Sequence, residues 1–458
     1  MSFPEGFLWG VAAASFQNEG AAFEDGKGAS IWDMMARWEG KIWNGDTPEP
    51  ACDQYHRYPE DARIMREIGI KCYRMSVAWP RVFPEGIGAV NEKGLAFYDR
   101  FIDTLLENGV EPWVSLYHWD YPYALHLRGG WLNPDSPDWF ADYTAVVVDR
   151  LSDRVMYWET INEPQVFIGA GYREGTNPPG LKLDNPEVLL VAHNTLLSHG
   201  KGVQVIRARA RREPRVGAVL VGFVAAPATD SPEDIEAARN YMFTLTKNQL
   251  KNTWLADPIY FGRYPEDGMQ VHGKDVPQIR PGDMETICQP LDFCCINLYA
   301  GETVRASSNS RYEILPVSIG SPLTHTPWRV TPEIMYWGPR LFHERYGLPV
   351  VVTENGMDNC DWVHLDGKVH DLQRIDYLTR YLRELSRAID DGVDVRGYFH
   401  WTFTDNWECI LGYKPRMGIV YVDYATQKRI LKDSAYWYRD VIASNGAVFD
   451  AKPNTETW

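Results

Sequence analysis

The chain has 458 residues, a formal net charge of −16 and an aromatic share of 13%. The negative charge disfavours nucleic acid and anionic membranes as partners, and no stretch approaches the roughly 20 apolar residues that cross a bilayer. Its N-terminus shows no secretion-signal pattern, and its seven cysteines are irregularly spaced. We therefore expect a cytoplasmic protein with reduced thiols and neither a disulfide framework nor a zinc site.

Short segments rich in β-branched and aromatic residues alternate with longer amphipathic segments along the chain. In chain order, the predicted strands are residues 7–14, 72–77, 111–117, 155–162, 216–224, 293–297, 350–353 and 395–401. Between them, helices are predicted over residues 58–68, 92–108, 139–151, 188–211 and 374–391. Eight strands that alternate with helices predict an α/β fold, a closed parallel (β/α)8 TIM barrel that comprises residues 1–458 as a single domain.

An open, doubly wound sheet would fit the same alternation of strands and helices. However, no Gly-x-Gly-x-x-Gly motif follows a predicted strand, so the dinucleotide-binding form of that fold lacks its fingerprint. Residues 304–327 are rich in Ser, Pro and Gly, and we expect them to form an extended loop at the mouth of the barrel.

Catalytic groups in such barrels lie at the carboxyl ends of the strands. Polar residues and tryptophans follow most of the predicted strands. They include Gln17, Glu19, Arg74, His118, Trp119, Asp120, Asn162, Glu163, Asn297, Tyr299, Glu354, Trp401, Asp405 and Glu408. Flat rings beside hydrogen-bonding groups suit a sugar, which has both apolar faces and hydroxyl edges.

Two of these residues, Glu163 and Glu354, directly follow predicted strands within the segments Thr-Ile-Asn-Glu-Pro (160–164) and Val-Thr-Glu-Asn-Gly (352–356). A single glutamate at such a position is more often a helix cap or an ion-pair partner. Two carboxyl groups at one barrel mouth are what glycoside hydrolysis needs. One group must be protonated to donate to the leaving oxygen, and the other must be ionised to attack or to activate water.

These two segments resemble the active-site motifs of glycoside hydrolase family 1, the β-glucosidase family. Residues 7–20, 73–81, 118–122 and 405–408 are similar to further motifs of that family, in the same order. The resemblance extends from residue 7 to about residue 424. It implies a β-glucosidase that removes terminal non-reducing β-D-glucosyl residues from disaccharides or aryl glucosides by a retaining double displacement. The 11 histidines form no metal-binding motif, so we expect neither a metal nor a cofactor.

The resemblance also implies a role for individual residues. Glu163 would be the general acid/base, Glu354 the nucleophile, and Arg74 and Asn297 would orient the nucleophile. The implied substrate-binding residues are Gln17, His118, Trp119, Asn162, Tyr299, Trp328, Trp401, Trp407 and Glu408. Among them, Trp401 would be the stacking floor under the sugar and Trp328 the platform for the leaving group. Taken alone, His118 fits a satisfied core histidine, and Trp401 fits packing at the barrel rim.

Two residues depart from the family pattern. Cys409 replaces a tryptophan whose indole N–H can bind a sugar hydroxyl, and Leu298 replaces an aromatic residue. We therefore expect a roomier sugar pocket with side activity on β-galactosides or β-fucosides. The carboxylate of Glu408 would repel a sugar phosphate, which favours a neutral sugar over the substrate of a 6-phospho-β-glycosidase.

Other functions remain open at this point. A non-catalytic sugar-binding protein would typically lose one of the two glutamates, and both are present in this chain. A transglycosylase would share every catalytic residue with a hydrolase. The sequence leaves open the natural aglycone, the preferred linkage and whether the chain forms a homo-oligomer.

Overall fold

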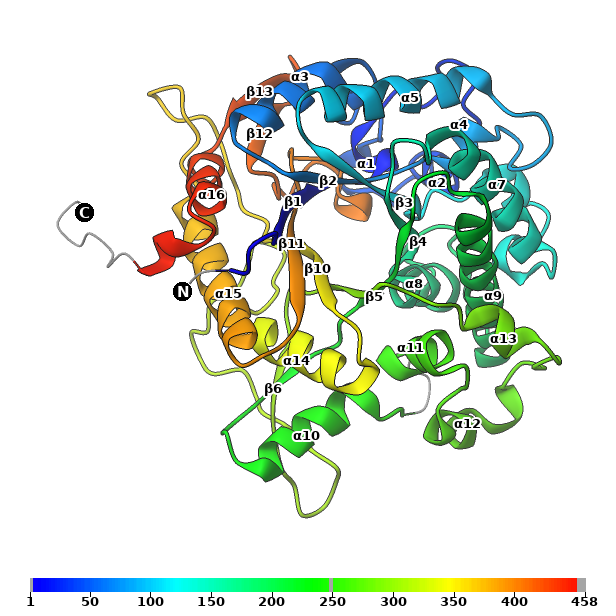
Figure 1. The fold of residues 1–458 in the computed structure, drawn as a ribbon, viewed down its shortest axis with the longest axis vertical. Coiled ribbons are helices and arrows are strands. Elements are labelled where there is room, and N and C mark those ends of the chain that lie inside the picture. The colour runs from blue at the N-terminus through cyan, green and yellow to red at the C-terminus, as the bar shows by residue number, and fades with distance from the viewer. Residues whose placement is uncertain (1–2, 247–249, 451–458) are drawn as a thin grey trace.

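Eight parallel strands form a closed barrel in the computed structural model, which describes residues 3–246 and 250–450 (Figure 1). Around the barrel, the strand order is β1-β11-β10-β7-β5-β4-β3-β2. These strands are β1 (Leu8–Ala12), β2 (Cys72–Ser76), β3 (Glu111–Tyr117), β4 (Tyr157–Asn162), β5 (Arg215–Val221), β7 (Phe293–Asn297), β10 (Val350–Asn355) and β11 (Val395–Trp401). Each overlaps a predicted strand. The predicted barrel is therefore confirmed, and the open sheet is excluded because β1 pairs with both β2 and β11.

The interior of the barrel is filled by alternate side chains of its strands. The Trp113 ring on β3 lies 4.9 Å from that of Phe293 on β7 and 5.1 Å from that of Phe399 on β11, although these strands are not neighbours. On β1, Gly10 faces Phe399 so closely that a Cβ atom would lie 2.3 Å from the ring. A packed interior leaves the mouth of the barrel as the place where a small molecule can bind.

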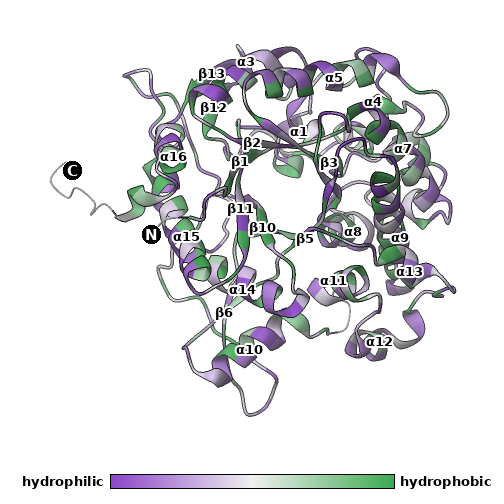
Figure 2. Cartoon of the chain, viewed as in Figure 1, coloured by the Kyte–Doolittle hydropathy of each residue, from purple (hydrophilic) through white to green (hydrophobic). Residues whose placement is uncertain are grey.

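A ring of helices surrounds the strands (Figure 1). Its main helices are α3 (Gln54–Glu67), α5 (Glu92–Glu107), α7 (Ser136–Leu151), α9 (Asn185–Arg209), α14 (Ile334–Tyr346) and α15 (Leu372–Asp390). Hydrophobic and hydrophilic residues alternate along these helices (Figure 2), as in amphipathic helices that cover a sheet. Within residues 3–246 and 250–450, no helix combines the length and apolar character needed to cross a membrane.

The ends of these helices follow from local sequence signals. At the start of α9, the Asp184 side chain accepts from the backbone of the third helical residue, and Glu187 accepts from the Asp184 backbone in return. Helix α5 ends before Gly109, whose φ of 73° lies in the left-handed region. Glycine adopts that conformation without a steric penalty, which explains why Asn108-Gly109 separates the helix from β3.

The expected loop over residues 304–327 contains regular structure at its start. Strand β6 (Ala225–Pro227) pairs with β8 (Glu302–Arg305), and β8 pairs with β9 (Glu313–Ile314) in a small three-stranded sheet. The expected extended loop therefore includes two short strands in its first half. Strands of two to four residues are too short to produce the alternation by which strands are recognised in a sequence.

Candidate active site

Strands β4 and β10 become irregular where they approach the predicted carboxyl pair. The register of β4 against β5 shifts between Glu159 and Asn162, and that of β10 against β7 shifts between Val352 and Glu354. Such irregularities rotate the following side chains relative to the strand. Glu163 has a φ of 45° and precedes Pro164, the first residue of helix α8 (Pro164–Ile168). A residue before proline avoids the right-handed helical region, so the chain turns sharply at Glu163.

A pocket of about 850 Å³ opens at this end of the barrel. It is lined by both glutamates and by residues that follow several different strands. Of the predicted site residues, it brings together Gln17, His118, Trp119, Glu163, Tyr299, Trp328, Glu354, Trp401 and Glu408. Arg74, Asn162 and Asn297 lie directly behind this lining, where they are buried and hydrogen-bonded to lining residues.

Arg74 is the centre of the buried charges beneath the pocket. Its Nε donates to Glu159 at 2.7 Å, its Nη1 to Glu354 at 2.5 Å and its Nη2 to the Asn162 amide oxygen at 2.7 Å. All three nitrogens of one rigid guanidinium are thereby hydrogen-bonded, which orients the Glu354 carboxylate. Glu159 is not among the site residues predicted from the sequence. An acidic residue on a buried strand needs a cationic partner, and that requirement is the signal that could have identified it.

The two carboxyl groups have different partners. Glu354 accepts from Arg74 and, at 2.7 Å, from the Tyr299 hydroxyl, whereas Glu163 accepts from the neutral Asn297 amide at 2.9 Å. Burial raises the pKa of Glu354, and the cation and the phenol oppose that rise. Burial and the nearby Glu354 charge raise the pKa of Glu163 to about 8. Near neutral pH, the pocket therefore favours a protonated Glu163 beside an ionised Glu354.

A second group of polar side chains lies on another side of the pocket. Gln17 donates to the Glu408 carboxyl group at 3.1 Å, and burial together with nearby acidic residues raises the pKa of Glu408 to about 8. The His118 ring stacks against Trp401 with centroids 5.5 Å apart. Burial, together with the charge of Arg74, holds the pKa of His118 well below its usual value, so this imidazole is neutral.

Backbone strain is concentrated around the pocket. Three lining residues that are not glycine, Trp119, Glu163 and Cys409, have φ values of 72°, 45° and 53°. Each such conformation costs free energy that the surrounding structure must compensate, and this kind of strain clusters at functional sites.

The structure does not bring Trp407 to the pocket, although the sequence analysis predicted it to bind substrate. Its fully buried ring packs edge-on against Phe16 and Trp32, with centroids 5.9 and 5.5 Å away. Only its backbone takes part in the site, because its carbonyl oxygen accepts from the Gln17 amide at 3.2 Å. An indole held among other aromatic rings contributes to packing, and Trp407 is not among the residues that line the pocket.

Several polar residues at the strand ends stabilise the fold and do not line the pocket. Asp405 forms a buried ion pair with Lys432 at 2.6 Å, and Glu19 pairs with Arg81 at 2.9 Å. Asp120 accepts from a buried serine hydroxyl. Position after a strand thus identifies residues near the mouth without determining which of them face the ligand.

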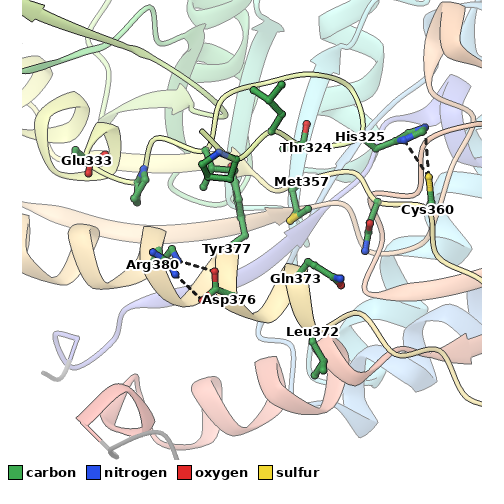
Figure 3. A pocket seen from close by; sticks show the side chains of 15 residues that line it. Thr324, His325, Glu333, Met357, Cys360, Leu372, Gln373, Asp376, Tyr377 and Arg380 are labelled. Carbon is green, nitrogen blue, oxygen red and sulfur yellow. Dashed lines mark hydrogen bonds and ion pairs between the residues drawn. The ribbon is translucent and has the colours of Figure 1, made fainter. Parts of the chain in front are cut away.

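A second cavity of about 960 Å³ is lined in part by segment 322–332 (Figure 3). Thr324 and His325 of this segment line that cavity, whereas Trp328 lines the first pocket. The charged side chains of Asp376 and Arg380 in the second cavity pair with each other at 2.7 Å. None of the predicted site residues is among the described residues that line it, so the predicted residues that face a cavity gather at the first pocket.

Comparison with known proteins agrees with this geometry. A model of the family described as glycosyl hydrolase family 1 matches residues 1–447. The chain belongs to glycosyl hydrolase family 1. It is therefore an O-glycoside hydrolase by family.

Several known glucosidases are similar to this chain over almost its whole length. A 1,4-β-D-glucan glucohydrolase of Thermotoga neapolitana is 45% identical, covering 97% of this chain and 99% of the relative. β-Glucosidase A of Thermotoga maritima is 43% identical, covering 97% of this chain and 98% of the relative. The structure of a T. maritima β-glucosidase in complex with glucoimidazole superimposes with a TM-score of 0.89 at 43% identity, covering 97% and 99% of the two chains.

Proposed function

We propose that this chain is a β-glucosidase that hydrolyses terminal non-reducing β-D-glucosyl residues with net retention of anomeric configuration. The observation that carries the proposal is the pair of buried carboxyl groups, Glu163 and Glu354, which line one pocket with different partners. Glucose as the sugar is supported by the names of the similar proteins and by the glucoimidazole bound in the T. maritima β-glucosidase.

In the first step, protonated Glu163 donates its proton to the glycosidic oxygen while Glu354 attacks the anomeric carbon. The bond from that carbon to the leaving group breaks, and a glycosyl ester forms on Glu354. Arg74 and Tyr299 favour the ionised form of Glu354, and they position the oxygen that attacks. Asn297 directs the Glu163 carboxyl group from behind.

In the second step, Glu163 acts as a base toward water. The ester on Glu354 carries no negative charge, so the contribution of that charge to the raised pKa of Glu163 disappears. Glu163 is then more readily ionised and can accept a proton from the attacking water. That water displaces Glu354 from the anomeric carbon, and the second inversion restores the β configuration.

The remaining residues of the pocket bind the sugar in this proposal. Gln17, His118 and Glu408 provide hydrogen bonds to hydroxyls, and the Trp401 ring is the apolar floor. Asn162 lies behind these lining residues, and its side-chain nitrogen is 3.2 Å from Nε2 of His118. In this proposal it approaches the 2-hydroxyl of the sugar from that position. The buried carboxyl group of Glu408 hydrogen-bonds hydroxyls and offers no cation to a phosphate, which favours a neutral sugar over a phosphorylated one, and Cys409 leaves room for β-galactosides or β-fucosides.

We also propose that the protein works in the cytoplasm and that residues 1–458 act as one catalytic unit. All seven cysteines are free, and four of them are buried. Unpaired thiols fit a reducing compartment better than an oxidising one.

The proposal is tested by proton NMR during hydrolysis of an aryl β-D-glucoside, in which the anomeric signal of the first glucose released is followed. β-Glucose at early times is expected, and α-glucose would overturn the double displacement. The Glu354→Ala variant is expected to release no glucose. No release by the unaltered enzyme would contradict the glucosidase function itself.

A further inference from the structure

The active-site pocket has two parts of different chemistry. Its inner part contains the carboxyl groups of Glu163, Glu354 and Glu408, together with Gln17 and His118. The outer part is lined mainly by apolar side chains. They are Val166, Val221, Phe223, Trp328, Ile410 and Leu411.

These apolar residues come from separate parts of the chain and converge on the mouth. Val166 belongs to α8, Val221 ends β5, and Ile410 lies in the short helix η5 (Cys409–Leu411). Trp328 is 37% exposed, and its ring centroid lies 5.2 Å from that of Tyr299, whose hydroxyl contacts the nucleophile Glu354. A group that covers Trp328 would therefore sit next to the reacting carbon.

Most polar groups in the outer part already have partners. Arg329 forms an ion pair with Glu302, and the Thr326 hydroxyl donates to Asp358 at 2.6 Å. Asn177 contributes one further amide to the lining. A second sugar would press several hydroxyls against aliphatic walls, where each hydroxyl that lacks a partner is unfavourable. An alkyl chain or an aromatic ring instead gains free energy from the same walls.

We propose that the leaving group of the preferred substrates is an apolar alcohol, alkyl or aryl, and not a second sugar. This assignment rests on the proposed β-glucosidase function and specifies its substrate class: β-D-glucosides of apolar alcohols. The inner part of the pocket selects the sugar by hydrogen bonding. The outer part selects the aglycone by burial of apolar surface.

The test is a series of methyl, butyl and hexyl β-D-glucosides compared with cellobiose, with kcat/KM measured by glucose release. The alkanols differ little in acidity, so a trend in this series reports contact with the pocket. Each methylene that reaches the wall is expected to raise kcat/KM by roughly fourfold, and the hexyl glucoside should exceed cellobiose. A flat series, or cellobiose at or above the hexyl glucoside, would overturn the aglycone assignment.

Two variants at lining positions from separate parts of the chain localise the effect. Ile410→Ser and Phe223→Ser are each expected to lower kcat/KM for the hexyl glucoside by roughly threefold or more, with little change for the methyl glucoside. The matched control is Ile319→Ser, because Ile319 is fully exposed outside the pocket. This control variant should leave kcat/KM unchanged for both the hexyl and the methyl glucoside. Equal losses on both glucosides in both wall variants would contradict the proposal.

The aglycone assignment and the glucosidase function fail in different ways. If 4-nitrophenyl β-D-glucoside is hydrolysed while the alkyl series is flat, only the aglycone assignment is wrong. If no glucoside of any kind is hydrolysed, the glucosidase function is wrong and the aglycone assignment falls with it.

Discussion

Replacing Tyr299 with phenylalanine removes a donor that favours the ionised form of Glu354. The lost contact is the 2.7 Å hydrogen bond from the phenol to the carboxylate. Hydrogen bonds to charged groups contribute about 1.5–3 kcal/mol, and about 1.4 kcal/mol corresponds to one pH unit in a pKa. The pKa of Glu354 should therefore rise by about one to two in Tyr299→Phe.

The sign of the effect on activity follows from the role of Glu354. Hydrolysis requires this group to be ionised, so a higher pKa moves the acidic limb of the kcat/KM profile to higher pH. The assay is kcat/KM for an aryl β-D-glucoside across the acidic and neutral range. Tyr143→Phe is the matched control, because the buried Tyr143 hydroxyl donates only to backbone carbonyl groups. An acidic limb that stays in place or moves to lower pH would refute the reasoning.

Three further changes test other parts of the site. In Asn297→Ala, Glu163 loses a donor that favours its ionised form, so its pKa should rise further and the alkaline limb of kcat/KM should move to higher pH; a downward movement would contradict this. Arg74→Met leaves two buried carboxylates without their cation. Urea denaturation should show that the free energy of unfolding falls by about 3–5 kcal/mol, and hydrolysis should be lost. A free energy of unfolding equal to that of the unaltered protein would count against the role of these ion pairs. Cys409→Trp introduces an indole donor at the pocket wall and should lower kcat/KM for β-galactosides relative to β-glucosides by roughly two- to tenfold; an unchanged ratio would mean that Cys409 does not broaden sugar selection.

The barrel could be predicted because its strands are short apolar runs separated by amphipathic helices with clear stop signals. The bounds of β3, β7 and β11 match the predicted segments at both ends. The two residues of β9 could not be predicted, since a strand of that length is defined by its partner β8 and not by its own sequence. Long-range pairing of this kind leaves no local pattern.

The position of the site followed from topology, because all parallel strands of a closed barrel end at the same mouth. The direction in which each side chain points could not be predicted from topology. It depends on strand irregularities and on left-handed turns such as the one at Glu163. Trp407 shows that position after a strand does not determine which side chains line the pocket. It follows β11 closely in sequence, yet its ring packs into an aromatic cluster and is not part of the pocket lining. Glu159 was not predicted because it lies within a strand, and it influences the site only through its hydrogen bond with Arg74.

The ring of strands closes between the first strand and the last, and the sugar site spans that closure. The Thr402 hydroxyl after β11 donates to the Ala12 carbonyl on β1 at 2.6 Å, and Gln17 contacts Glu408, which is 391 positions away in the sequence. No fragment that ends before residue 408 contains both halves of this contact. We therefore expect a nascent chain to remain inactive until nearly the whole protein has left the ribosome. Two separately expressed halves should hydrolyse glycosides only after they assemble.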